Sequence, residues 1–191
     1  MVRVKASYID YFIYFLPVEW MKDVLLGMAS KNLEGSPVSW SEMLSYIGLW
    51  ILMSSVATRG NTRAYWDNSD TSTLKGAPFI LHSYMSFAHF YAITKALSFT
   101  DHTPYLYRHT FWEVRQMIHD WNWHMSDVFI SGWVSCLEES MSIWTSMWSC
   151  PGFMFVPRKP HPVGNEYHTI ADGLCGIVFG MEIVKGKDKP K

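Results

Sequence analysis

Apolar residues recur at spacings of three and four over the first two thirds of the chain, which is the pattern of helices with one buried face. This pattern predicts helices over residues 40–56, 86–98 and 112–126. The first is expected to bury Met43, Leu44, Ile47, Trp50 and Ile51, opposite Ser41, Ser45 and Gly48. The second places Phe90, Ile93 and Leu97 on one face, and the third places Val114, Met117, Ile118, Trp121 and Met125 on one face.

The first of these helices has a clear start signal. Ser39 and Glu42 form a capping box, in which each side chain accepts a hydrogen bond from a backbone N–H of the first turn. Val38 and Met43 flank the box at positions where two apolar side chains can pack together and fix the entry of the chain. The polar segment 58–61 is expected to end the helix.

The spacing of the apolar residues changes after Gly132. Residues 133–137 form a short apolar run without helical spacing, and four prolines lie between residues 151 and 162. Asp172-Gly173 sits between two runs rich in β-branched and aromatic residues, which predicts a hairpin with positive φ at both turn residues. We therefore expect a strand that ends near Glu138 and pairs with the strands of this hairpin.

These patterns predict a mixed α/β fold in three parts. Residues 1–36 form an N-terminal segment, residues 37–130 a helical region, and residues 131–191 a strand region. The strand region closes with a basic tail over residues 185–191.

Composition narrows the class of protein. The chain has 191 residues, of which 49% are hydrophobic and 17% charged, enough to build a buried core. Ten Trp, ten Tyr and eleven Phe offer so much ring surface that part of it is expected to contact a partner. The net charge of −1 excludes a strong overall positive field, so any contact with nucleic acid has to be local.

Cysteine and hydropathy patterns favour an intracellular protein that does not enter a membrane. Cys136, Cys150 and Cys175 are odd in number and form no C-x-x-C pair, so we expect free, at least partly buried thiols. The longest nearly apolar run, residues 43–57, falls short of the ~20 residues that cross a bilayer. The N-terminus shows no secretory cleavage site.

Candidate chemistry concentrates in Ser135–Met141, where an acidic pair follows a short apolar run. Such a strand can deliver carboxylates to a metal site, with Glu138 as the candidate ligand; Glu139 is expected to face solvent or an arginine. Solvated or core histidines are expected at His82, His89, His102, His109, His119 and His124, whose spacing indicates no metal site. Arg158 and Lys159, with Lys185 and Lys187 of the tail, form either a small phosphate-facing patch or an ordinary soluble surface.

The same strand resembles the Leu-Ser-Val-Asp-Glu-Ser-Met strand of piggyBac-type transposases, with Glu138 in place of their first catalytic Asp. Residues 85–101 are similar to that family's Met-Ser-x-x-Arg-Phe helix and Leu-x-Phe-x-Asp end, with His89 where Arg is usual. Weaker similarities lie at Ile47-Gly48 with Tyr65-Trp66, in residues 111–129, at Pro157-x-Lys159-Pro160-His161, and at Ala171-Asp172 with Lys185-Gly186-Lys187. They cover roughly residues 40 to 190 in the family's order.

This resemblance implies an RNase H-like sheet, incomplete in this chain, and strand cleavage and joining of DNA with two Mg²⁺ or Mn²⁺ ions. Two such cations about 4 Å apart need three converging carboxylates. Glu138 occupies one of those positions, and the family's other two are expected beyond Lys191. The extra methylene of Glu moves its oxygens by roughly 1 Å, a displacement that costs about a hundredfold in a positioned site. No cofactor is therefore expected for this chain itself.

The sequence leaves three functional hypotheses, of which the first two follow from the resemblance. The favoured one is a catalytically incomplete, transposase-derived nuclear protein that binds DNA, a protein partner or a full-length transposase subunit. The alternative is part of an active metal-dependent transposase whose remaining carboxylates lie outside this chain. A helical protein-interaction module that uses exposed tryptophans is the third.

Overall fold

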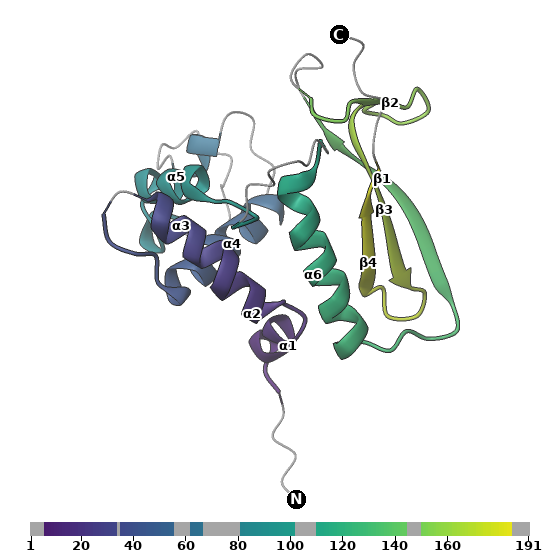
Figure 1. Cartoon of the computed structure of the whole chain (residues 1–191), viewed down its shortest axis with the longest axis horizontal. Coiled ribbons are helices and arrows are strands. Elements are labelled where there is room, and N and C mark those ends of the chain that lie inside the picture. The colour runs from purple at the N-terminus through teal and green to yellow at the C-terminus, as the bar shows by residue number, and fades with distance from the viewer. Residues whose placement is uncertain are drawn as a thin grey trace, which may run out of the picture. The chain divides into compact units, whose positions relative to one another are not determined.

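The computed structural model describes residues 6–33, 35–55, 62–66, 81–101, 110–144 and 150–184. The chain forms two compact units. The helical unit comprises Met21–Asp101, and the sheet unit comprises Met1–Trp20 together with His102–Lys191 (Figure 1). Helices and an antiparallel sheet are both present, which confirms the predicted mixed α/β class.

The helical unit contains three α-helices and three shorter helical segments among its described residues. They are η1 (Met21–Leu26, a π-helical stretch), α3 (Gly27–Asn32), α4 (Trp40–Ser55), η2 (Thr62–Trp66), η3 (Leu81–Ser83) and α5 (Phe87–Ala96). The predicted capping box is present at the start of α4. The Ser39 N–H donates to Glu42 Oε2 over 2.8 Å, and the Glu42 N–H donates to Ser39 Oγ over 3.2 Å.

The buried face of α4 differs from the predicted one. It consists of Met43, Tyr46, Leu49 and Met53, whereas Trp50 and Ile51 are 45% and 46% exposed. The face is set by Phe90 of α5, whose ring centroid lies 5.0 Å from that of Tyr46. Packing between helices thus rotates the buried stripe away from the residues that hydrophobicity alone selects.

The other two predicted helices agree more closely with the structure. α5 begins after Ser86, whose hydroxyl caps the helix, and buries Phe90 and Ile93 with Ala96 in place of the expected Leu97. α6 (Trp112–Val128) buries Ile118 and Met125 as predicted. None of the described helices is long and apolar enough to cross a bilayer.

The sheet unit is built around one central strand. Its elements are α1 (Tyr8–Tyr14), α2 (Val18–Trp20), α6, β1 (Ser135–Ile143), β2 (Met154–Phe155), β3 (Val163–Asp172) and β4 (Val178–Ile183). All pairings are antiparallel: β1 pairs along one side of β3, and β2 and β4 pair with its other side. The hairpin places β4 beside β3, and the pairing of β1 with the other side of β3 leaves β3 in the middle (Figure 1).

One face of this sheet packs against α6. Phe111, Ile118 and Ile183 form the buried cluster, with Val114, Met117, Tyr167 and Met181 packed around it. The Asn122 amide fixes the helix to β4 through both polar groups of Met181: Nδ2 donates to its carbonyl over 2.8 Å, and its N–H donates to Oδ1 over 2.9 Å. These two hydrogen bonds tie the middle of the helix to one residue of β4.

The strand that carries Glu138 is longer than predicted. β1 begins at Ser135 and continues to Ile143, so Glu138 lies inside the strand and not at its end. The cause is that β3 pairs with every residue of β1, including the polar ones, from Ser135 opposite Asp172 to Ile143 opposite Gly164. Backbone pairing extends the strand past the apolar run from which it was predicted.

The predicted hairpin is present, but its turn is of another kind. Positive φ occurs at Gly176 (73°), and neither Asp172 nor Gly173 adopts it. The turn is organised by the buried Asp172 carboxylate, which accepts hydrogen bonds from the N–H groups of Gly132 (2.6 Å), Leu174 (2.9 Å) and Cys175 (2.9 Å). Gly173 is needed for a different reason: a Cβ there would lie 2.6 Å from Val134 Cγ1.

None of the three cysteines forms a disulfide, as predicted, but only Cys150 is buried. Cys136 lies on the edge strand β1 and Cys175 in the hairpin turn, and both are exposed. Their burial was predicted from the residue type alone, which carries no information on strand position.

Asp172 should make the stability of the fold depend on pH. Its three N–H donors lower the pKa of the carboxyl far below its usual range. The resulting stabilisation is present above the unfolded-state pKa and is lost as pH falls through the folded-state pKa, roughly between pH 4 and pH 2. We expect Asp172→Asn to lower stability at pH 7 and to flatten this acid limb in urea unfolding curves. Asp127→Asn, at an exposed α6 position, is the control; an unchanged acid limb in Asp172→Asn would contradict the assignment.

Candidate functional site

Glu138 stands exposed on β1 on the α6-facing side of the sheet. It pairs in register with Thr169, two residues from the Ser140–Tyr167 pair, and Tyr167 packs under α6. Because side chains alternate along a strand, Glu138 and Tyr167 share a face. Within the described parts of the chain, the Glu138 carboxylate has neither a hydrogen bond nor an ion pair and belongs to no group of three possible metal ligands.

This environment does not fit a two-metal centre by itself. Two hard cations need several converging carboxylates, and among the described residues Glu138 belongs to no group of three possible ligands. A single exposed carboxylate can bind a cation weakly or face solvent. Within the described chain, Glu138 therefore does not form a two-metal catalytic site by itself.

The outer edge of β1 lies beside Glu138. β1 hydrogen-bonds β3 on one side, and no described strand pairs with its other side. Leu137 is 69% exposed on this strand, and Ile143 is exposed as well. An edge strand of this kind is a surface on which a further strand can pair.

Glu139 points to the opposite face of the sheet, where it meets the predicted basic pair. The Arg158 guanidinium forms an ion pair with the Glu139 carboxylate, and the Lys159 ammonium donates to the Glu139 carbonyl. The expectation that Glu139 faces solvent or an arginine is thus met by Arg158. Glu138 and the basic pair lie on opposite faces, so the structure does not join them into one site.

The remaining predicted residues are distributed as follows. Lys185 and Lys187 lie outside the described residues, as do His102 and His109. His89, at the position where the resembled family has Arg, lies 3.2 Å from Glu42 Oε1 and links α5 to α4. Hydrogen bonds from Ser39, with His89 nearby, lower the pKa of Glu42. His124 contacts the Tyr14 carbonyl over 2.9 Å, and His119 lies beside Asp120.

Two functional candidates were missed in the sequence. Glu166 and His168 lie on β3 and, with Glu139, form a group whose potential ligand atoms all lie within 4.8 Å of one another. The available signal was the spacing of two between Glu166 and His168, which places both on one face of a strand. Nothing in the sequence showed that Glu139 faces them, because that depends on the register of β1 on β3.

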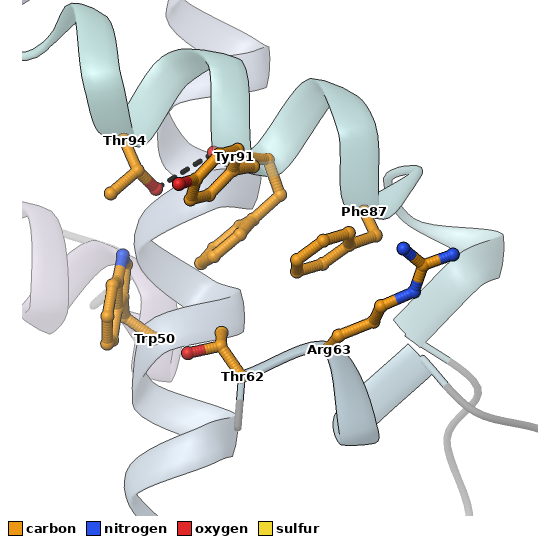
Figure 2. A pocket seen from close by; sticks show the side chains of 7 residues that line it. Trp50, Thr62, Arg63, Phe87, Tyr91 and Thr94 are labelled. Atoms are coloured by element: carbon orange, nitrogen blue, oxygen red, sulfur yellow. Dashed lines mark hydrogen bonds between the residues drawn. The ribbon is translucent and has the colours of Figure 1, made fainter.

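The helical unit carries a separate concave feature. A pocket of about 410 Å³ is lined by Trp50, Thr62, Arg63, Phe87, Phe90, Tyr91 and Thr94. Figure 2 shows Trp50 of α4 on one side and Phe87 of α5 on the other, with the Arg63 guanidinium beside the Phe87 ring, 5.6 Å from its centroid. Trp50, expected in the core, instead forms a wall of this pocket.

Comparison with known proteins identifies the class. Residues 7–191 match the family model described as Transposase IS4, and the chain therefore belongs to that transposase family. This agrees with the resemblance that the sequence motifs indicated. No curated protein matches the chain.

Among solved structures, the chain is similar to a piggyBac transposase, solved by cryo-EM as a synaptic complex with hairpin DNA. The TM-score is 0.67 at 15% sequence identity, and the match covers 97% of this chain. The chain spans 41% of the length of that transposase. At this identity the similarity establishes the fold.

Proposed function

We propose that this chain is a transposase-derived, DNA-acting protein that binds DNA or a protein partner without cleaving DNA itself. The observation that carries the proposal is the isolation of Glu138: within the described chain it belongs to no group of three possible metal ligands. Family membership supports action on DNA, and nuclear localisation is proposed on the same ground. The substitution of Glu for the family's Asp at this position supports the lack of turnover.

The proposed DNA contacts are the basic residues predicted from the sequence: Arg158, Lys159, Lys185 and Lys187. Arg158 is largely exposed even though it pairs with Glu139, so its guanidinium can exchange that carboxylate for a phosphate. Since such ion pairs at exposed sites contribute only about 0–1 kcal/mol, the exchange costs little. Lys159 is held to the β1 backbone and places a second positive charge beside Arg158.

A second candidate function is supported by the unpaired side of β1. In an active metal-dependent DDE-type transposase, with Mg²⁺ or Mn²⁺, the other carboxylates would come from a second subunit or from residues outside this sequence. A further strand pairing with β1 would bring groups next to Glu138, because Glu138 lies within that strand. A protein partner at this edge is therefore compatible with both candidates.

The first test concerns strand cleavage. Purified chain with Mg²⁺ or Mn²⁺ should neither nick nor join labelled DNA, and Glu138→Asp should not restore activity, because one carboxylate cannot hold two metals. Glu138→Ala and the exposed-site control Glu182→Ala should behave like the parent. Metal-dependent cleavage that is lost in Glu138→Ala and kept in Glu182→Ala would favour the active transposase instead.

The second test concerns DNA affinity and its salt dependence. If two to four phosphates are neutralised, the logarithm of the binding constant should fall with log salt at a slope of roughly −2 to −4. Removing residues 185–191 and changing Arg158 and Lys159 to Ala should abolish binding in fluorescence anisotropy. Glu139→Gln should free Arg158 and steepen the slope by about 1. A charge-deleted chain that binds like the parent would place the DNA surface elsewhere.

A further inference from the structure

The Glu139-facing side of the sheet carries a group of side chains that the proposed function does not use. Glu139 lies on β1 directly opposite His168 on β3, and Glu166 lies two residues before His168 on the same face. The potential ligand atoms of the three residues lie within 4.8 Å of one another. β1 and β3 run side by side along their whole length (Figure 1), so two adjacent strands hold the group.

Glu166 supplies an independent indication that this group has a ligand. Its side chain is only 10% exposed, and its carboxylate accepts no hydrogen bond from the described residues. The His168 Nε2 atom lies 3.9 Å from Glu166 Oε1, too far for a hydrogen bond. His168 is thus a distant ion-pair partner of Glu166, and a cation bound between the two side chains would contact each of them directly.

The donor set indicates the kind of cation. Carboxylate oxygens alone suit Mg²⁺ and Ca²⁺, whereas an imidazole nitrogen among them favours a transition-metal ion. Zn²⁺ binds His nitrogen and carboxylate oxygen at about 2.0–2.2 Å, which puts ligand atoms of a tetrahedral site about 3.4 Å apart. The 3.9 Å between His168 Nε2 and Glu166 Oε1 needs only a small side-chain rotation to reach that spacing.

Charged side chains next to the group affect how readily a metal ion can bind its carboxylates. Arg158 and Lys159 approach Glu139 from the turn after β2, and Glu182 of β4 stands opposite His168 in the register. Arg158 forms an ion pair with the Glu139 carboxylate. It has to release one of the Glu139 carboxylate oxygens before a metal ion can bind to that oxygen. Because Arg158 is largely exposed, it can swing into solvent.

We propose that Glu139, Glu166 and His168 bind one Zn²⁺ ion on the sheet face opposite Glu138, with a fourth position open to water. This ion would join β1 to β3 and neutralise the buried Glu166 carboxylate. Because the site is separate from the Glu138 position, a failure to bind Zn²⁺ would not contradict the proposed lack of DNA cleavage, and DNA cleavage would not contradict the Zn²⁺ site. Arg158 acts as a competitor that releases Glu139 when Zn²⁺ binds.

The test uses the purified full chain, stripped with EDTA and titrated with ZnCl₂ by calorimetry. We expect one site whose affinity falls about a hundredfold or more in Glu166→Gln and in His168→Ala, because each removes a ligand. Glu138→Gln, on the other face of the same strand, and His161→Ala should leave the affinity unchanged. Arg158→Ala should bind at least as tightly as the parent.

Thermal unfolding separates a metal ligand from a merely structural residue. Metal-free Glu166→Gln should melt at or above the parent's temperature, since it removes a buried charge, yet it should lose the rise in melting temperature that Zn²⁺ gives the parent. Co²⁺ in place of Zn²⁺ should give a tetrahedral absorption spectrum in the parent that is absent in Glu166→Gln.

Three results would overturn the proposal. They are no saturable Zn²⁺ binding by the parent, equal binding by the parent and Glu166→Gln, and binding that Cys136→Ser or Cys175→Ser abolishes while Glu166→Gln leaves it intact. The last would assign the metal to exposed thiols. If His168→Ala does not fold, calorimetry and thermal unfolding of Glu166→Gln decide whether the proposed site binds Zn²⁺.

Discussion

The register of β1 on β3 is the constraint on which the sheet unit depends. Every residue of β1 has a partner on β3, and side chains alternate between faces along both strands. A slip of one residue would move Glu138 to the Arg158 side and Glu139 to the α6 side. The pairing therefore separates two adjacent carboxylates into different environments: one exposed and unpaired, the other paired with Arg158 and close to Glu166 and His168.

The register is held from its end by the turn around Asp172. That residue is the β3 partner of Ser135, and its carboxylate also binds the Gly132 N–H just before β1 begins. Gly173 adds a backbone hydrogen bond to Val134 over 2.8 Å. Hydrogen bonds from the hairpin turn thus hold residues 132–134, which lead into β1. A shift of β1 along β3 would break these hydrogen bonds together.

The local capping signal predicted the start of a helix correctly, the local Asp172-Gly173 signal predicted a hairpin but not its turn geometry, and contacts between distant residues left no signal. The Ser39–Glu42 capping box acts within one turn, so the start of α4 could be read directly. The buried face of α4 could not, because it depends on Phe90 some forty residues further on. The length of β1 was underestimated for the same reason: its polar half is a strand through pairing with β3.

The residues of the candidate site also divide into those that a local sequence pattern indicates and those that only a contact between distant residues reveals. Glu138 was selected because a strand motif carries it, and Glu139 was expected to face solvent or an arginine. Glu166 and His168 were missed, since their relation to Glu139 exists only across the pairing of β1 with β3. A sequence pattern along one strand reveals which residues share a face, but not which residues of the neighbouring strand stand beside them.

The amide of Asn122 has a consequence for how this sheet can be extended. By bonding both the N–H and the carbonyl of Met181, it occupies the outward-facing polar groups of β4 in the way a neighbouring strand would. Addition of a strand there would have to break both bonds, whereas on β1 a new strand would have to displace the Lys159 ammonium from the Glu139 carbonyl. The two margins of the sheet therefore differ: a short helix side chain bonds both backbone groups of Met181 on one margin, and a flexible lysine contacts a backbone carbonyl on the margin that carries Glu138.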